Sequence, residues 1–163
     1  MMKKRLKVIR LAVLTLLAIV CAVPSASAQK GEMTVGLDGG YASYNKGGYV
    51  KAFMHYTIVP HVRLAPELGF AFRNEGRSAF LLDFDVQFPF RLTRGLNIYP
   101  LAGVTFNNWS YEGAGHDSRV GLDFGGGFDI YLTRQLKFMV QGKYSLMNDT
   151  GGGFVGLGIG YNF

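Results

Sequence analysis

Large apolar residues alternate with small or polar residues along most of the chain after residue 30. The last segment is the clearest case: Val155, Leu157, Ile159, Tyr161 and Phe163 alternate with Gly156, Gly158, Gly160 and Asn162. A period of two residues is typical of a β-strand with two different faces. The length of this segment also suits one tilted strand that crosses a bilayer, which needs about nine to eleven residues.

The same alternation predicts eight strands. They cover residues 32–42, 49–59, 62–72, 79–91, 96–106, 119–132, 136–146 and 154–163. Three related segments, at 58–64, 92–98 and 132–138, place apolar residues around a short break and predict tight turns. Four breaks richer in glycine, asparagine and charge, at 43–48, 73–78, 107–118 and 147–151, predict longer loops.

Short turns at one end and longer loops at the other are typical of an outer-membrane barrel. The chain is therefore expected to be all-β, as an eight-stranded antiparallel up-and-down transmembrane β-barrel. With eight strands, both termini lie on the short-turn side. This arrangement predicts periplasmic termini and longer extracellular loops.

The two faces of the expected strands separate sharply. In the strand at 79–91, the apolar face carries Phe80, Leu82, Phe84, Val86, Phe88 and Phe90, and the opposite face carries Asp83, Asp85 and Gln87. No charged residue falls on the apolar face of any expected strand.

Alternation alone does not say which face points outward, because a soluble lipocalin-like barrel would place its bulky face inside. Glycines concentrate on the small and charged face, which suits the crowded lumen of an eight-stranded barrel. Aromatic residues of the apolar face gather near the strand ends, as the interfacial girdles of a membrane barrel require. They are Tyr56, Phe88, Phe90, Phe138, Tyr161 and Phe163 toward the turns, and Tyr41, Phe72, Phe80, Phe106 and Tyr144 toward the loops. Both observations favour a membrane barrel.

Three prolines, Pro66, Pro89 and Pro100, lie inside expected strands. Proline has no backbone N–H to donate to a β-ladder. We therefore expect an interruption of hydrogen bonding at each of these positions.

The first 28 residues form an expected signal peptide. Five basic residues precede an apolar run at 11–23, which Pro24 and the small residues Ser25–Ala28 follow, so cleavage is predicted after Ala28. Val20 stands where a small residue should precede a lipid-modified cysteine, which disfavours a lipoprotein anchored at Cys21. The expected domains are the signal peptide, 1–28, and the barrel, 29–163.

Removal of the signal peptide changes the charge of the chain. Five of the 17 lysines and arginines lie in it, so 12 remain against 11 acidic residues. A nearly neutral mature chain gives no support for nucleic-acid binding.

Most remaining charges fall on the inward face of the expected strands. The predicted lumen network contains Asp38, Lys51, Arg63, Glu67, Asp83, Asp85, Arg119, Asp123, Asp129, Lys137 and Lys143, and Arg73 is expected to project into it as well. Six acidic and six basic residues then balance, so paired charges are expected to fill the lumen, where an unpaired ion is costly.

The chain resembles small bacterial outer-membrane β-barrel proteins of the Bacteroidetes type, and more loosely the eight-stranded surface-protein barrels. The segments that carry the resemblance are RLAPELGFAF at 63–72, NIYPLAGVTF at 97–106 and GIGYNF at 158–163. The spacing of Gly158, Tyr161 and Phe163 resembles the C-terminal assembly signal of outer-membrane barrels, although Gly156 stands where that family usually has a polar residue. The resemblance implies an outer-membrane location, contact with membrane lipid, and insertion by the barrel-assembly machinery.

Residue types that could carry chemistry are scattered. His116, Asp117 and Ser118 include nucleophile and base types, but a triad is recognised by geometry rather than by proximity in sequence. With His55, His61 and His116 far apart and no cysteine in the mature chain, neither a metal site nor a cofactor is expected. No catalytic residue is assigned.

The segment 107–118 is the longest expected loop, and it contains Trp109, Tyr111 and His116. Tryptophan and tyrosine are enriched at binding hot spots. The loop is therefore a candidate recognition site for an extracellular protein or surface ligand, and an interfacial aromatic anchor is the alternative.

The sequence thus predicts a non-enzymatic outer-membrane barrel with a structural or surface-interaction role and a lumen closed by paired charges. A narrow porin-like channel for small solutes is the first alternative. A lipid-modifying outer-membrane enzyme is the second.

Overall fold

The computed structural model describes residues 30–148 and 150–163 of the 163-residue chain, so the expected signal peptide lies outside the described residues. The strands are β1 (Met33–Ala42), β2 (Gly47–Val59), β3 (Val62–Asn74), β4 (Arg77–Gln87), β5 (Phe90–Thr93), β6 (Leu96–Tyr111), β7 (Gly115–Tyr131), β8 (Leu136–Met147) and β9 (Thr150–Asn162). No helix within these residues is long and apolar enough to cross a membrane.

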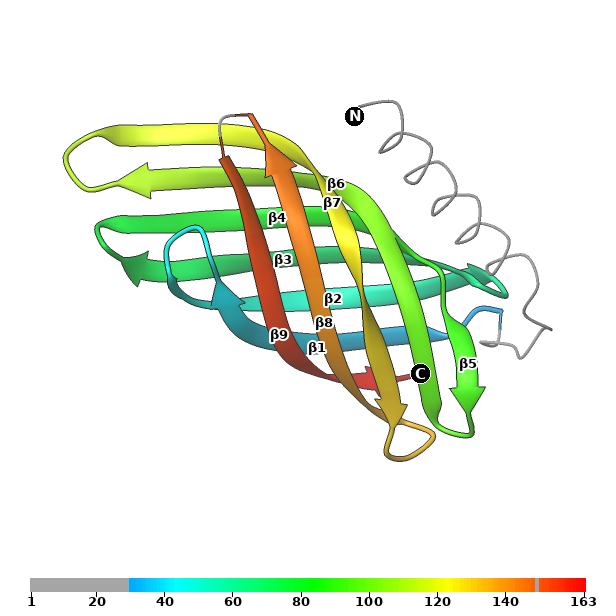
Figure 1. Ribbon diagram of the computed structural model, residues 1–163. Coiled ribbons are helices and arrows are strands. Elements are labelled where there is room, and N and C mark those ends of the chain that lie inside the picture. Colours follow the sequence, from blue (N-terminus) through cyan, green and yellow to red (C-terminus); the bar gives the residue numbers. More distant parts are fainter. Residues whose placement is uncertain (1–29, 149) are drawn as a thin grey trace, which may run out of the picture.

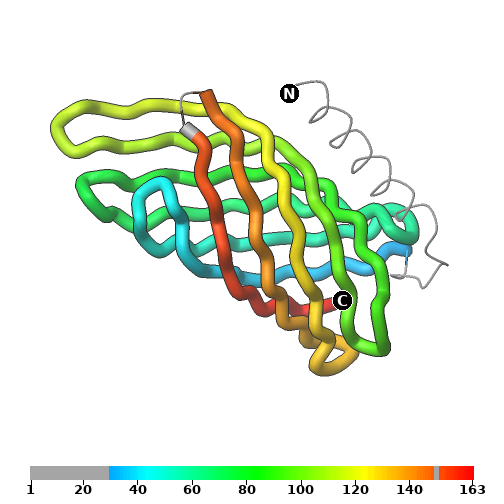
Figure 2. Tube along the Cα trace, in the orientation of Figure 1, coloured from blue at the N-terminus to red at the C-terminus, as the bar shows by residue number. Residues whose placement is uncertain are grey.

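The strands close into one antiparallel barrel (Figures 1 and 2). Neighbours in sequence pair around the sheet, and β1 pairs with β9 from Thr34 opposite Asn162 to Ala42 opposite Phe154. Because β4 and the short β5 both pair with β6 in one continuous register, they act as a single fourth strand. The all-β, eight-stranded up-and-down barrel is therefore confirmed.

The break between β4 and β5 falls where a proline was expected to interrupt the sheet. Pro89 lies between the two strands, and the Phe88 backbone N–H donates to the Pro100 carbonyl at 3.0 Å across the break. The ladder between β2 and β3 also lacks its pairs opposite Pro66, between the pairs Phe53–Glu67 and Tyr56–Leu64. Pro100 lies opposite the β4–β5 break, but its own pairing with Gly126 of β7 is uninterrupted. Each proline thus lies at or opposite an interruption, whereas the irregularities after Thr57 and Ala71 contain no proline.

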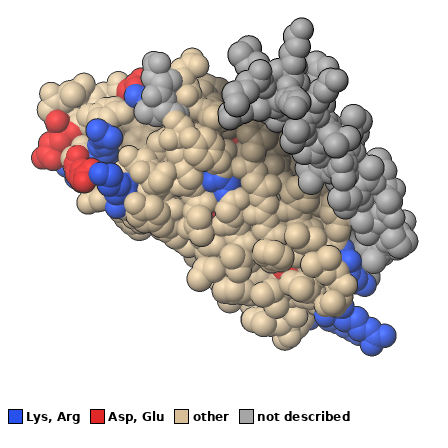
Figure 3. Space-filling view, in the orientation of Figure 1, with Lys and Arg blue, Asp and Glu red and all other residues tan. Residues whose placement is uncertain are grey.

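The bulky apolar face points out of the barrel. On β9, Val155, Leu157 and Ile159 are 62, 55 and 50 % exposed, whereas the inward Asp123 and Asp129 of β7 are fully buried. Charged atoms accordingly gather toward the two ends of the surface, with few between them (Figure 3). An apolar outer wall around a polar interior contradicts a soluble lipocalin-like barrel and fits lipid.

The four longer loops expected from the sequence are wrong in their bounds. The ladder between β6 and β7 continues to the pair Tyr111–Gly115, so only residues 112–114 connect these strands. The connection between β3 and β4 is equally tight, with positive φ angles at Glu75 and Gly76. Most of the expected loop at 107–118 therefore belongs to β6 and β7, whose hairpin projects from one end of the barrel (Figure 1).

Candidate functional site: the filled lumen and the mouth at the hairpin end

The lumen contains a charge cluster built around one lysine. Lys143 of β8 places its Nζ atom 3.0 Å from Glu67, 2.7 Å from Asp83, 2.8 Å from Asp85 and 3.1 Å from Asp123. These carboxylates come from β3, β4 and β7, and all five side chains are almost completely buried. One ammonium group therefore links walls on opposite sides of the barrel.

A second lysine completes this cluster. The Nζ atom of Lys51 lies 2.6 Å from Asp83 and 3.1 Å from Glu67, so the two lysines share both carboxylates. The Thr105 hydroxyl donates to the other oxygen of Asp83 at 2.6 Å. Such charge-assisted contacts are the strong class of hydrogen bond, and they fix the side chains in place.

A smaller charged group lies nearer the end of the barrel that carries the β2–β3, β5–β6 and β7–β8 connections, which we call the turn end. The Arg63 guanidinium pairs with Asp129 at 2.6 Å, and Lys137 lies 3.7 Å from the same carboxylate. The Lys137 ammonium also donates to His55 at 3.2 Å. Gln141 connects the two groups: its amide donates to Glu67 at 3.0 Å, and its carbonyl accepts from Gln87 at 3.3 Å. Gln87 in turn accepts from the Arg63 guanidinium at 2.7 Å.

Two apolar layers enclose the main charge cluster along the barrel axis. One layer lies toward the end with the β1–β2, β3–β4, β6–β7 and β8–β9 connections, which we call the hairpin end; it contains Ala42, Tyr49, Ala71, Ala79, Leu81, Trp109 and Phe154. The other layer lies toward the turn end and contains Phe53, Tyr99, Leu101 and Met139. Along β2 the order is Tyr49, Lys51 and Phe53, so the main cluster lies between the layers. The lumen is therefore filled by side chains, as expected for eight strands.

The expected balance of lumen charge is wrong. Arg73 is exposed, because an irregularity in the β3–β4 ladder after Ala71 interrupts the alternation of faces. Arg119 lies at the barrel mouth, half-buried, and donates to Asp117 at 2.7 Å. Six acidic side chains and only four basic ones are buried in the described lumen.

Asp38 is one of the six acidic side chains and stands apart from the network. It is 5 % exposed, and its Oδ1 atom has no hydrogen-bond partner among the described residues. The remaining predicted lumen residues lie in the lumen as expected.

The candidate recognition residues do not form an exposed loop. Trp109 is 3 % exposed and lies in the apolar layer, with its ring centroid 5.5 Å from that of Tyr44. Its inward position follows from the alternation of β6, which continues through residues expected to form a loop. Trp109 is therefore part of the floor of the barrel mouth. Of the three predicted residues, only His116 is exposed, and Tyr111 is half-buried.

A hollow of about 310 Å³ opens above this floor. It is lined by Tyr44, Arg77, Trp109, Tyr111 and Arg119. The Arg77 guanidinium lies 6.0 Å from the centre of the Tyr111 ring, and Arg119 donates to the Tyr111 hydroxyl at 3.3 Å. Burial raises the pKa of the Tyr44 hydroxyl above its ordinary value, so this group stays neutral.

Sequence reasoning missed Tyr44 and Arg77 as residues of this mouth. Each was assigned to a separate loop, and only the closure of the barrel brings the connection after β1 beside the start of β4. The aromatic residue inside a glycine-rich break was the one available signal, because turns seldom need a large apolar ring.

His116, Asp117 and Ser118 do not form a catalytic triad. Asp117 pairs with Arg119 and not with His116, and Ser118 is exposed on the wall of β7. Within the described part of the chain, no three His, Cys, Asp or Glu side chains are placed so that they could hold a metal ion.

The expected assembly residues lie at the seam of the barrel. Tyr161 and Phe163 point outward with ring centroids 5.1 Å apart, and the Phe163 N–H donates to the Met33 carbonyl at 2.9 Å. Gly158 faces the lumen opposite Asp38. The two aromatic rings thus stand at the lipid-facing rim of the turn end, and their role in assembly stays a prediction.

Several solved barrels have the same fold. The N-terminal β-barrel domain of Pseudomonas aeruginosa OprF is 21 % identical, with a TM-score of 0.71 over 83 % of this chain and 98 % of that one. Neisserial surface protein A is 16 % identical, with a TM-score of 0.70 over 82 and 99 %.

A third solved barrel is Ail, the attachment invasion locus protein of Yersinia pestis, which is 18 % identical with a TM-score of 0.61 over 83 and 100 %. Ail has also been determined in complex with the heparin analogue sucrose octasulfate. No curated protein matches the sequence significantly. The family model of the outer membrane protein beta-barrel domain matches residues 12–163, and the chain therefore belongs to that family.

Proposed function

We propose that this protein is a closed, non-enzymatic outer-membrane barrel that serves as a structural element and presents an interaction surface at its hairpin end. The observation that carries the proposal is the filled lumen, in which Lys143 contacts four carboxylates between two apolar layers. A solute would have to displace both layers and separate buried ion pairs. Breaking one buried pair costs about 3–5 kcal/mol.

The closed lumen predicts that purified protein in planar bilayers shows no stable conductance steps. Eight strands enclose a space that side chains just fill, whereas water-filled porins have about sixteen strands. Asp83→Asn provides a diagnostic variant, because it changes the charge of the lumen without changing the side-chain volume.

Reproducible steps that Asp83→Asn makes less cation-selective would support the channel alternative. The excess of buried acids over bases would favour cations in any open state. Conductance steps that Asp83→Asn leaves unchanged would not arise from ions that pass through the lumen.

The interaction surface is assigned to the hollow at the barrel mouth. Two arginines and three aromatic rings line it, and planar guanidinium groups suit the recognition of anionic groups. The complex of Ail with a sulfated heparin analogue supports an anionic carbohydrate as one ligand class for a barrel mouth of this kind. An extracellular protein remains the alternative partner.

This assignment requires that the hairpin tips face outside and the termini face the periplasm. In intact cells, a cysteine introduced as Ala114→Cys is expected to react with a membrane-impermeant maleimide, because Ala114 lies exposed in the β6–β7 connection. The one cysteine of the sequence, Cys21, lies in the expected signal peptide, so a mature chain cleaved after Ala28 carries the label at one site.

Arg134→Cys, in the β7–β8 connection at the opposite end, is the matched control. It should react only after the outer membrane is permeabilised. The reverse pattern of labelling would show that the assigned orientation is inverted.

A further inference from the structure

The charges of the described chain are distributed unevenly along the barrel axis. Outside the lumen, the turn end carries Lys30, Arg91, Arg94 and Arg134, and Glu32 is the only acidic side chain there among the described residues. The hairpin end mixes both signs, as in the exposed pair Lys46–Glu75 at 3.7 Å and the pair Arg119–Asp117 at 2.7 Å. A nearly neutral mature chain thus has one strongly basic rim.

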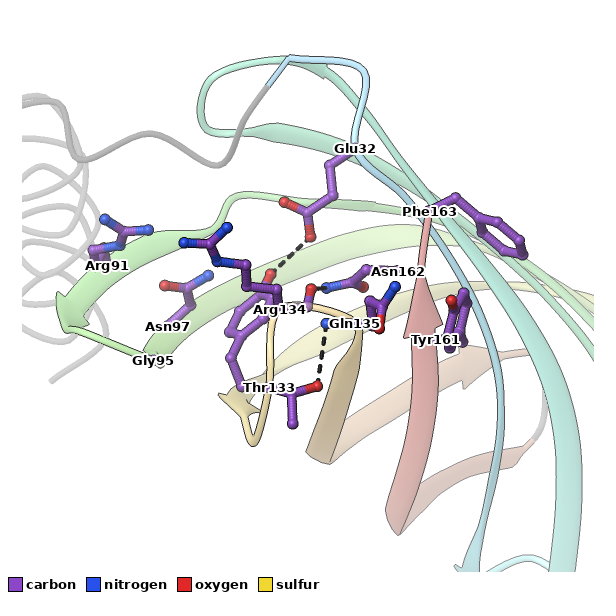
Figure 4. Close-up of a pocket in the computed structure, with 11 residues that line it drawn as sticks. Glu32, Arg91, Gly95, Asn97, Thr133, Arg134, Gln135, Tyr161, Asn162 and Phe163 are labelled. Carbon is purple, nitrogen blue, oxygen red and sulfur yellow. Dashed lines mark hydrogen bonds between the residues drawn. The ribbon is translucent and has the colours of Figure 1, made fainter.

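Part of this rim encloses a cavity of about 830 Å³. Its polar lining includes Arg91 of β5, Asn97 of β6, and Thr133, Arg134 and Gln135 of the β7–β8 connection. Figure 4 shows the guanidinium groups of Arg91 and Arg134 on the same side of the opening, with Tyr161 and Phe163 on the other side.

The acidic residue of the cavity is already engaged. Glu32 accepts a hydrogen bond from the Tyr131 hydroxyl at 2.9 Å, whereas neither Arg91 nor Arg134 forms an ion pair with a carboxylate of the described chain. Two guanidinium groups beside one cavity repel each other, and an anion placed between them relieves that repulsion.

Hydrogen bonds fix the backbone around the cavity. The Asn162 N–H donates to the Gln135 carbonyl at 2.7 Å, and Thr133 accepts from the backbone N–H groups of Gln135 and Leu136 at 3.2 and 2.9 Å. The Tyr131 N–H donates to the Gly95 carbonyl at 2.7 Å. The turn that carries Arg134 is thus held against both neighbouring strand ends, so the backbone that positions Arg134 is fixed.

We propose that this turn-end cavity binds the phosphate of an anionic phospholipid headgroup from the adjoining leaflet. The cavity is continuous with the lipid-facing surface, because Tyr161 and Phe163, which are 46 and 73 % exposed, belong both to its lining and to the apolar outer wall. A headgroup phosphate would contact Arg91 and Arg134 while its acyl chains follow the outer wall beside Phe163. Arginine forks match phosphate geometry, and basic pockets at a membrane surface attract anionic headgroups.

The proposal is tested with the whole barrel reconstituted in phosphatidylcholine vesicles that contain spin-labelled phosphatidylglycerol or spin-labelled phosphatidylcholine. Electron paramagnetic resonance gives the relative association of the two lipids with the protein. The wild-type barrel is expected to prefer phosphatidylglycerol by about fivefold. Arg91→Gln/Arg134→Gln should reduce this preference to near one.

Lys46→Gln/Arg73→Gln is the matched control, since it removes two exposed positive charges from the hairpin end, outside the cavity. It should retain most of the preference. An equal loss in both double variants would overturn the proposal, because diffuse charge attraction would then account for the lipid preference. No preference in the wild-type barrel would overturn it as well.

A second measurement separates a lipid headgroup from a soluble anion. Inorganic phosphate is titrated into the protein in uncharged detergent, and binding is followed by phosphorus NMR line broadening. Phosphate binding that requires Arg91 and Arg134 without any phosphatidylglycerol preference in vesicles would identify a soluble-anion site and overturn the lipid assignment. Preference for the lipid with weak or no binding of free phosphate would support it.

Discussion

Replacing Lys143 with methionine is expected to lower the free energy of unfolding of the barrel by about 3–5 kcal/mol. The substitution keeps the approximate length of the side chain but removes the ammonium group that four carboxylates share. Glu67, Asp83, Asp85 and Asp123 would then lie close together, with only Lys51 in contact with two of them. Urea titration in detergent micelles, read from the gel mobility of unheated samples, measures the change.

Lys46→Met is the control, because it removes the same group from an exposed ion pair with Glu75. Such surface pairs contribute about 0–1 kcal/mol. Adding Asp85→Asn and Asp123→Asn to Lys143→Met should restore part of the lost stability, since fewer charges are then left unpaired. Equal unfolding midpoints for Lys143→Met and Lys46→Met would show that the cluster does not stabilise the barrel.

Deleting Phe163 is expected to lower the amount of heat-modifiable protein in the outer membrane several-fold without blocking export. The side chain is 73 % exposed, and the described contacts of the residue are one backbone hydrogen bond to Met33 and the ring contact with Tyr161. Its loss should therefore affect the folded barrel little. The expected defect lies in recognition by the assembly machinery, because Gly158, Tyr161 and Phe163 resemble the C-terminal signal that this machinery recognises.

Quantitative blotting of outer-membrane fractions measures this yield, and refolding of the purified truncated chain in detergent provides the comparison. Phe163→Tyr keeps the aromatic ring and should assemble normally. A truncated chain that reaches the outer membrane at full yield would remove the basis for the assembly signal. A truncated chain that also fails to refold would show a structural defect instead.

The faces of the strands could be predicted from the sequence because lipid and the lumen impose opposite requirements on alternate residues. A slip of one residue in the register of β4 would point Asp83 and Asp85 toward the lipid hydrocarbon, so the register of this strand is strongly specified. Pro89 likewise marked the break between β4 and β5, since the missing N–H is a local property of the residue.

The strand ends could not be predicted in the same way. Beyond the lipid, both faces of a strand meet polar surroundings, so the alternation fades although backbone pairing continues from Asn107 to Tyr111. The position of Arg73 depends on an irregularity in the β3–β4 ladder, which no residue in the segment signals.

The lumen residues were mostly predicted, but their partners were not. Each inward charge follows from the period of its own strand, whereas the contact of Lys143 with Glu67 joins β8 to β3 across the barrel. Strand tilt and stagger decide which residues of opposite strands lie at the same height in the barrel. Those quantities are properties of the closed sheet, so the partners of each lumen charge appear only in three dimensions.

The way Lys143 joins distant strands also has a consequence for the order of events during insertion. Its partners lie on β3, β4 and β7, so a chain whose first and last strands have not yet met would expose an unpaired ammonium group and several carboxylates. Hydrocarbon does not tolerate such groups, nor does it tolerate an open sheet edge. We therefore expect desolvation of the polar interior to be coupled to closure of the β1–β9 seam during insertion.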